Sequence, residues 1–152
     1  MCLIIDTNCI GQLTSGHRDM LLVLEWLVGT KRKKPKGNLT YSLTDKMKDE
    51  WFGPNASQDF LHLLGELTKA GKPPRVVPVA EVQQALNDLT YVLKSNDRHI
   101  VGLAIASGCR VLVSNDQKLH TDFIEATKEK SRRGKIYQNS THGHLLDGYR
   151  CV

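Results

Sequence analysis

Two aspartates follow short apolar segments in distant parts of the sequence. Asp6 follows Leu3–Ile5, and Asp116 closes a run that begins with Val111. A third acid, Asp97, stands at the expected start of a helix that leads into the second run. Carboxylates about 5 Å apart repel each other by roughly 3 kcal/mol at an effective dielectric near 20, a cost that a bound divalent cation reverses. If these acids meet in the fold, they predict a metal site.

The elements expected around these acids bring them to one edge of a sheet. Short β-branched runs closed by polar residues are typical of buried parallel strands, and ligands collect at the carboxyl ends of such strands. Strand-like and helix-like segments alternate along the chain. With right-handed crossovers, this order predicts an α/β fold, a three-layer sandwich whose central parallel sheet is flanked by helices.

The boundaries of the elements follow from apolar periodicity, capping residues and breaks at Gly and Pro. Strands are predicted at residues 3–5, 38–41, 75–79, 111–113 and 135–138, the last at an edge of the sheet. Helices are predicted at residues 17–28, 44–52, 57–70, 81–93, 95–107 and 117–127. The tail from residue 139 to 152 has no clear period.

A fourth acid is expected from the helix over residues 44–52, where three candidates compete. Met47 and Trp51 lie on the apolar stripe of this helix, and successive residues turn by about 100°. That phase places Asp45 and Asp49 on the opposite side, whereas Glu50 borders the buried face. We therefore select Glu50 as the fourth member of the site.

Each acid also has a purely structural interpretation, which the sequence leaves open. Asp6 could fix a turn, Asp116 could cap the helix that follows it, and Asp97 could be favoured by a helix dipole. Their coincidence at one edge of the sheet favours a site over three unrelated roles. His99 could protonate a leaving group, but a packed and hydrogen-bonded histidine is the better interpretation, because it faces another side of its helix than Asp97.

Composition indicates one domain over residues 1–152, since 40% of the residues are hydrophobic and no linker divides the chain. No segment has the roughly 18 apolar residues of a membrane span, and the start of the chain lacks a signal-peptide pattern. We therefore expect a cytoplasmic protein that does not enter a membrane.

The cysteines form no C-x-x-C pair, which favours reduced thiols over disulfides or zinc. They are Cys2, Cys9, Cys109 and Cys151.

Positive charge is concentrated in two segments of a chain whose net charge is +5. One segment contains Lys31, Arg32, Lys33 and Lys34, and another contains Lys128, Lys130, Arg132, Arg133 and Lys135. Such runs are most often only solvated. Together with an acidic pocket, however, they suit a phosphodiester substrate, because the basic surface attracts the phosphate backbone. We predict that the first segment binds nucleic acid.

The acidic segments resemble a known family. Leu3 to Ile10, the helix that contains Glu50, and the stretch from Ser95 to Phe123 are similar to the PIN domain, the PilT N-terminal nuclease family, including its small bacterial toxins. The resemblance places the family's acids on Asp6, Glu50, Asp97 and Asp116. Asn8 and Asn115 would line the same site. One departure weakens a second metal site, because Lys118 or Leu119 stands where the family often has a further acid, and Asp122 would be at best an outer residue.

The resemblance implies a metal-dependent endoribonuclease, with RNA as substrate and the toxin of a toxin-antitoxin pair as one role. An all-oxygen ligand set would select Mg²⁺ or Mn²⁺. An antitoxin protein and a second copy of the chain are further candidate partners. The alternatives are a structure-specific DNA nuclease, since DNA is also a candidate substrate, and a non-catalytic nucleic-acid-binding module on the same fold.

Overall fold

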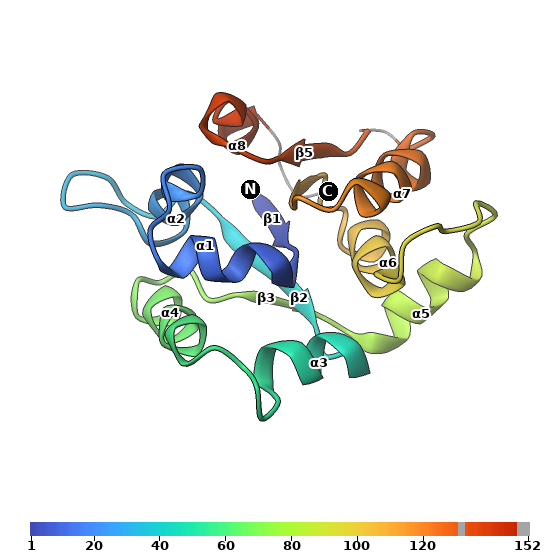
Figure 1. Cartoon of the computed structure of the whole chain (residues 1–152), viewed down its shortest axis with the longest axis horizontal. Helices are drawn as coiled ribbons and strands as arrows, with labels where there is room; N and C mark the ends of the chain where they lie inside the picture. Colours follow the sequence, from blue (N-terminus) through green and yellow to red (C-terminus); the bar gives the residue numbers. More distant parts are fainter. Residues whose placement is uncertain (131–132, 149–152) are drawn as a thin grey trace.

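A parallel sheet forms the centre of the molecule. The computed structural model describes residues 1–130 and 133–148. Its five strands have the order β3-β2-β1-β4-β5, and all neighbours are parallel (Figure 1). They are β1 (Cys2–Ile5), β2 (Asn38–Ser42), β3 (Arg75–Val77), β4 (Val111–Val113) and β5 (Lys135–Tyr137). The predicted parallel sheet is confirmed, with β5 at one edge.

Helices cover both faces of the sheet (Figure 1). On one face, α1 (Ile10–Thr14), α2 (Leu21–Val28) and α4 (Gln58–Lys69) contact one another. On the other, α6 (Arg98–Ser107) packs between α5 (Val79–Asn87) and α7 (Gln117–Thr127). Every residue of β1 and β4 is buried between these layers, which explains their apolar sequences. The three-layer α/β sandwich is confirmed.

Shorter elements complete the described chain. η1 (Thr7–Cys9) follows β1 directly, and α3 (Asp45–Phe52) follows β2. Near the end of the described chain lie η2 (Ser140–His142) and α8 (Leu145–Gly148). The Trp26 indole N–H donates to the Leu146 carbonyl over 2.7 Å, so α8 is attached to α2 even though the sequence of this tail shows no period.

Three helices are shorter than predicted by at least three residues. One is α6, predicted from residue 95, which begins at Arg98. The helix predicted over residues 81–93 ends at Asn87. Leu89 and Leu93 still pack against the core, but from a loop, so their helix-like spacing was misleading. The helix predicted from residue 17 begins at Leu21, because residues 17–20 form a turn in which His17 Nδ1 accepts the Asp19 N–H.

All strands of the sheet point the same way, so the sheet has a carboxyl edge, where the strands end, and an amino edge, where they begin. Loops that leave the strands lie at the carboxyl edge, and loops that return from the helices lie at the amino edge. The returning loops α2–β2 and α7–β5 carry the described residues of the two basic segments, which therefore lie at the amino edge, and Arg132 lies outside the described residues. None of the described helices is long and apolar enough to cross a membrane.

The three described cysteines follow the prediction only in part, and Cys151 lies outside the described residues. Cys9 and Cys109 are free and buried, as expected for core thiols. Cys2, however, is disulfide-bonded, so the prediction of reduced thiols is wrong for this residue. Burial raises the pKa of the Cys9 thiol to about 11, and the negative charge of Asp6 adds to this effect. Cys9 is therefore a core residue and not a reactive thiolate.

Candidate functional site

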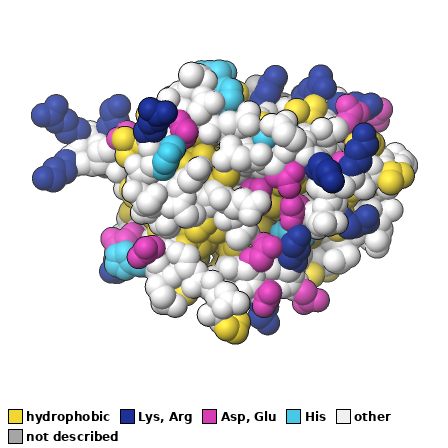
Figure 2. Space-filling view, viewed as in Figure 1, with side chains coloured by type: hydrophobic (Ala, Val, Ile, Leu, Met, Phe, Trp, Pro, Cys, Tyr) yellow, Lys and Arg dark blue, Asp and Glu magenta, His cyan; other side chains and the backbone are white. Residues whose placement is uncertain are grey.

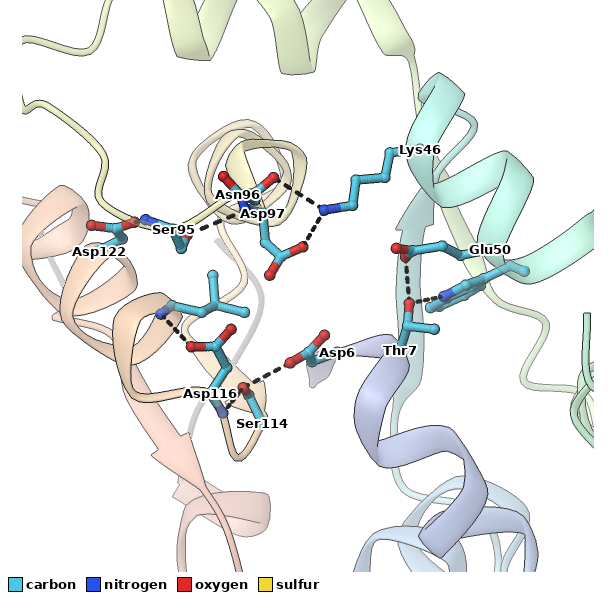
Figure 3. A network of polar contacts seen from close by, with 12 residues as sticks. Asp6, Thr7, Lys46, Glu50, Ser95, Asn96, Asp97, Ser114, Asp116 and Asp122 are labelled. Carbon is cyan, nitrogen blue, oxygen red and sulfur yellow. Dashed lines mark hydrogen bonds and ion pairs between the residues drawn. The ribbon is translucent and has the colours of Figure 1, made fainter.

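The four predicted acids line one pocket at the carboxyl edge of the sheet (Figure 3). Its volume is about 460 Å³. The acids come from four separate places in the chain, namely the end of β1, α3, the start of α6 and the start of α7. The other lining residues are Thr7, Asn8, Lys46, Lys94, Ser95, Asn96 and Lys118. Acidic side chains gather in the same region of the surface in Figure 2.

Asp6 is the most buried of the four acids, with 3% of its surface exposed. Its backbone N–H donates to the Val113 carbonyl over 2.9 Å, which continues the pairing of β1 with β4. The Ser114 hydroxyl donates to the carboxylate over 3.0 Å. Burial raises the pKa of Asp6, and the charges of Asp97 and Asp116 raise it further, against the lowering effect of the Ser114 hydrogen bond. The pocket therefore disfavours the charged form of Asp6 when no cation lies nearby.

Asp116 combines a structural role with a place in the pocket. One carboxylate oxygen, Oδ1, accepts the backbone N–H groups of Lys118 over 2.9 Å and Leu119 over 3.2 Å, so Asp116 caps α7. The Ser114 hydroxyl accepts the Asp116 N–H over 3.0 Å. Ser114 therefore connects Asp116 to Asp6 through one side chain. The capping interpretation is correct, and it does not exclude Asp116 from the pocket.

Glu50 faces the pocket from α3, on the side that helix phase predicts. Its Oε2 accepts the Thr7 hydroxyl over 2.6 Å, and that hydroxyl accepts the Trp51 indole N–H over 3.3 Å. Asp45 and Asp49 are exposed, and neither lines this pocket. Because Trp51 is completely buried, the Trp51–Thr7 contact fixes the direction in which Glu50 reaches the site.

Lys46 is a cation that the sequence did not predict at the site. It reaches from α3 to Asp97, with 2.7 Å between Nζ and Oδ1, and also donates to the Asn96 carbonyl (Figure 3). Burial lowers the pKa of Lys46, but the hydrogen bond and the charge of Asp97, together with the charges of Glu50 and Asp6, raise it overall. A charged ammonium group therefore already neutralises part of this acidic pocket.

Asp122 holds the segment that carries Asp97. It is fully buried, and its carboxylate accepts the backbone N–H of Lys94 at 3.0 Å and that of Ser95 at 2.7 Å. Burial alone would raise the pKa of Asp122, but these hydrogen bonds lower it overall. Asp122 is not a lining residue of the pocket, so its position outside the acid set agrees with the prediction. Its contact with residues 94 and 95 was not predicted.

Of the two asparagines predicted to line the site, only one does so. Asn8 lines the pocket and is exposed to solvent. Asn115 does not line it, because its amide group points to Cys9 and Gln12 on the other side of the loop. Ser114 does not line the pocket either, because it is fully buried, but its hydroxyl contacts the Asp6 carboxylate and the Asp116 backbone N–H from behind the site. The run Val111–Val113 ends one residue before Ser114, so strand alternation alone does not decide which of residues 114 and 115 faces the site.

The predicted nucleic-acid-binding segment is remote from the acids. Lys31, Arg32, Lys33 and Lys34 are exposed in the α2–β2 loop, which projects from the far left of Figures 1 and 2. This loop lies at the amino edge of the sheet, whereas the acids lie at the carboxyl edge. The cations at the pocket itself are Lys46, Lys94 and Lys118. Any contact of the basic loop with nucleic acid would therefore be made away from the acidic pocket.

The donor set of the pocket suits a hard divalent cation. Carboxylates and the Asn8 amide supply oxygen ligands, the type that Mg²⁺ and Mn²⁺ prefer. Among residues 1–130 and 133–148, however, no three Asp, Glu, His or Cys side chains form a group ready to hold a metal. The acids stand around the pocket, with Lys46 paired to one of them. Asp6, Glu50, Asp97 and Asp116 are the residues that could hold a metal.

Comparison with known proteins identifies the fold. No family model and no curated protein matches the chain. A solved structure, VapBC2 from Rickettsia felis bound to a DNA fragment from its promoter, is similar with a TM-score of 0.51. The two sequences are 16% identical, and the match covers 91% of this chain and 100% of that one. Together with the parallel sheet between two helical layers, this likeness shows that the chain has a PIN-like α/β sandwich fold.

Proposed function

We propose that this protein is a divalent-metal-dependent endoribonuclease that hydrolyses RNA phosphodiester bonds. The observation that carries the proposal is the meeting of Asp6, Glu50, Asp97 and Asp116 in one pocket, although they come from four elements. An acidic pocket repels a polyanion unless a cation binds first. The likeness to VapBC2 supports the same class of fold, and a role as the toxin of a toxin-antitoxin pair extends the proposal.

The residues divide the work according to their environment. Asp6 and Asp116 would hold the metal, because the Ser114 hydroxyl fixes the Asp6 carboxylate and the Asp116 backbone. Asp97 would act as a further ligand or orient the attacking water, and Glu50 would bind through water. When bound, Mg²⁺ or Mn²⁺ supplies Lewis-acid stabilisation of the charge on the reacting phosphate and a water of lowered pKa. Lys46, Lys94 and Lys118 would contact substrate phosphates around the pocket.

Cleavage assays with labelled single-stranded RNA and DNA test this proposal. We expect cleavage of RNA in the presence of Mn²⁺ and none with a chelator. Cleavage of DNA alone would favour the DNA nuclease instead. Binding of RNA without cleavage under any metal condition would favour a non-catalytic module. A pull-down with the product of the neighbouring gene tests the antitoxin partner separately.

Metal binding should also be visible without any substrate. A ligand that binds only the folded state stabilises it by about 2.7 kcal/mol at a hundredfold excess over Kd, so we expect Mn²⁺ to raise the Tm of the metal-free protein. Glu50→Gln should weaken this rise. Asp49→Asn is the matched control on the same helix, because Asp49 is exposed and does not line the pocket. An unchanged Tm at millimolar Mn²⁺ would contradict the metal proposal.

The basic loop can be tested through the salt dependence of RNA binding. Single-stranded binding has a slope of roughly −0.7 per phosphate neutralised, in log K against log salt concentration. Replacing Lys31, Arg32, Lys33 and Lys34 by Gln should flatten this slope by up to about 3 if all four contact phosphate. Turnover at saturating RNA should change little, because the loop lies at the opposite edge from the acids.

A second variant provides the comparison for this loop variant, since its segment also lies at the amino edge. It carries Gln in place of Lys128, Lys130, Arg133 and Lys135. If the α2–β2 loop variant keeps the wild-type slope and the comparison variant flattens it, RNA contacts the second segment instead. If both variants keep the wild-type slope, the amino edge does not take part in RNA binding.

A further inference from the structure

A second pocket lies beside the acidic one. It has a volume of about 300 Å³ and opens between the start of α3, the start of α6 and the second half of α5. Lys46 and Asn96 line both pockets, so the two are contiguous. The other lining residues are Thr44, Asp45, Gln83, Leu86, Asn87, Arg98 and His99. The acid set does not explain this second pocket, because none of its four members lines it.

Two of the lining residues are buried and carry a polar side-chain atom that is itself buried and has no partner in the described chain. Thr44 is 5% exposed and His99 is 8% exposed. In the described chain, neither Oγ1 of Thr44 nor Nε2 of His99 has a hydrogen-bond partner. His99 is packed as predicted, and its Nε2 atom is not hydrogen-bonded. Buried polar atoms are normally paired, so two unpaired atoms in one pocket indicate a missing ligand.

The backbone around the pocket favours an anion. Thr44 occupies the N-cap position of α3 and Asp97 that of α6, and neither side chain caps its helix. The Ile100 N–H donates to the Asp97 carbonyl over 3.0 Å, so the first-turn N–H groups left for a ligand are those of α3 and, on α6, those of Arg98 and His99. Helix N-termini bind phosphate through such N–H groups and through the helix dipole. Lys46 and Arg98 add two cationic side chains, whereas Asp45 is the one acid that lines this pocket among the described residues.

We propose that this second pocket is a phosphate subsite, which holds the phosphate adjacent to the one that is cleaved in a single-stranded substrate. The Thr44 hydroxyl would donate to a phosphate oxygen, as would the Nε2–H tautomer of His99. The first-turn N–H groups of α3 and α6 would complete the contacts, and Arg98 would balance the charge. The shared Lys46 lies between the two phosphates. The assignment of the bound group to a substrate strand rests on the proposed nuclease function.

Titration with inorganic phosphate tests the pocket without any catalysis. In ¹H–¹⁵N spectra, the backbone amide signals of Asp45, Lys46, Arg98 and His99 should shift with phosphate concentration. Thr44→Val, which removes the hydroxyl at nearly constant volume, should weaken this binding about tenfold. Its Tm without phosphate should not fall, because the substitution removes a buried hydroxyl that makes no hydrogen bond in the described structure.

Ser42→Ala is the matched control. Ser42 also carries a buried hydroxyl without a partner in the described chain, two residues from Thr44, but it does not line the pocket. Phosphate binding should therefore be unchanged in this variant. Amide signals that do not move with phosphate would overturn the subsite, even in a protein that cleaves RNA. An equal loss of binding in both variants would also overturn it.

A substrate with one neutral linkage connects the subsite to cleavage. An oligonucleotide with a methylphosphonate next to the cleaved bond should show a KM about tenfold higher with the wild-type protein, at similar kcat. Thr44→Val should show a much smaller difference between this substrate and the fully charged one. If the wild type does not distinguish the two substrates, the pocket does not hold the strand. If no nucleic acid is cleaved, the nuclease function fails, whereas the phosphate titration still decides the pocket.

Discussion

Asp6→Asn should abolish cleavage and at the same time stabilise the metal-free protein. Loss of a residue behind a metal ligand typically costs 10–100-fold in activity, so the loss of a buried ligand should reduce kcat/KM by more than about a hundredfold. In the absence of metal, the charged Asp6 carboxylate destabilises the folded protein, because it is 3% exposed and faces Asp97 and Asp116. Asn removes the charge and keeps the shape.

The pH dependence of stability gives the sign of this effect. Because the pKa of Asp6 is raised above 3.8 by burial, the folded state binds the proton more tightly than the unfolded state. Asp6 therefore destabilises the folded protein progressively as the pH rises through the window between 3.8 and the folded pKa. The Tm of Asp6→Asn should exceed that of the wild type above this window, and the difference should shrink below it.

Asp97→Asn separates loss of activity from relief of charge. It should also remove cleavage, but its Tm should not rise, because the substitution breaks the ion pair with Lys46. Asp49→Asn, at an exposed position on α3, should leave both quantities unchanged. Residual cleavage near the wild-type rate in Asp6→Asn would remove Asp6 from the catalytic set. A lower Tm would show that the carboxylate is needed for folding.

The acid set was predictable because each member sits where a local rule places it. Asp6 and Asp116 end apolar runs, and the carboxyl ends of parallel strands share one edge. The phase of α3 was enough to choose Glu50 over Asp49, since Met47 and Trp51 fix the buried side. Asp97 follows from the start of α6. These inferences require only the order of strands and helices along the chain, which the alternation of strand-like and helix-like segments predicts.

The supporting residues were not predictable in the same way. Lys46 reaches Asp97 across 51 positions of sequence, and Ser114 joins Asp6 across 108. Such contacts depend on where α3 and the β4–α7 loop lie in space. The basic loop is a different case, because the topology of a parallel sheet already sends the segment after α2 to the amino edge. Charge alone predicted that this loop binds nucleic acid, and the fold adds that it lies at the opposite edge of the sheet from the acids.

Asp122→Ala should have the largest effect on stability of any single substitution considered for this protein. The variant leaves the part-buried N–H of Lys94 and the buried N–H of Ser95 without their acceptor, and the cavity left by the carboxylate adds to the cost. We expect a loss of roughly 2–4 kcal/mol in the free energy of unfolding. At about 2–4 °C per kcal/mol for a chain of this size, Tm should fall by about 4–16 °C.

At low pH, Asp122→Ala and the wild type should differ less in their free energy of unfolding. The pKa of Asp122 is lowered, because the hydrogen bonds from Lys94 and Ser95 outweigh the effect of burial. Its stabilisation is therefore fully present above 3.8 and is lost as the pH falls through the folded pKa. Asp88→Ala, an exposed acid at the start of the same loop, should change the free energy of unfolding by no more than about 0.5 kcal/mol.

The consequence for the site distinguishes Asp122 from an ordinary core residue. Ser95 lines the acidic pocket and Asp97 begins α6, so release of residues 94 and 95 moves the start of α6. Even at a temperature where Asp122→Ala is folded, its Mn²⁺-induced rise in Tm should therefore be smaller than that of the wild type. A variant with lower Tm but an unchanged Mn²⁺ response would show that Asp122 stabilises the fold without positioning Asp97.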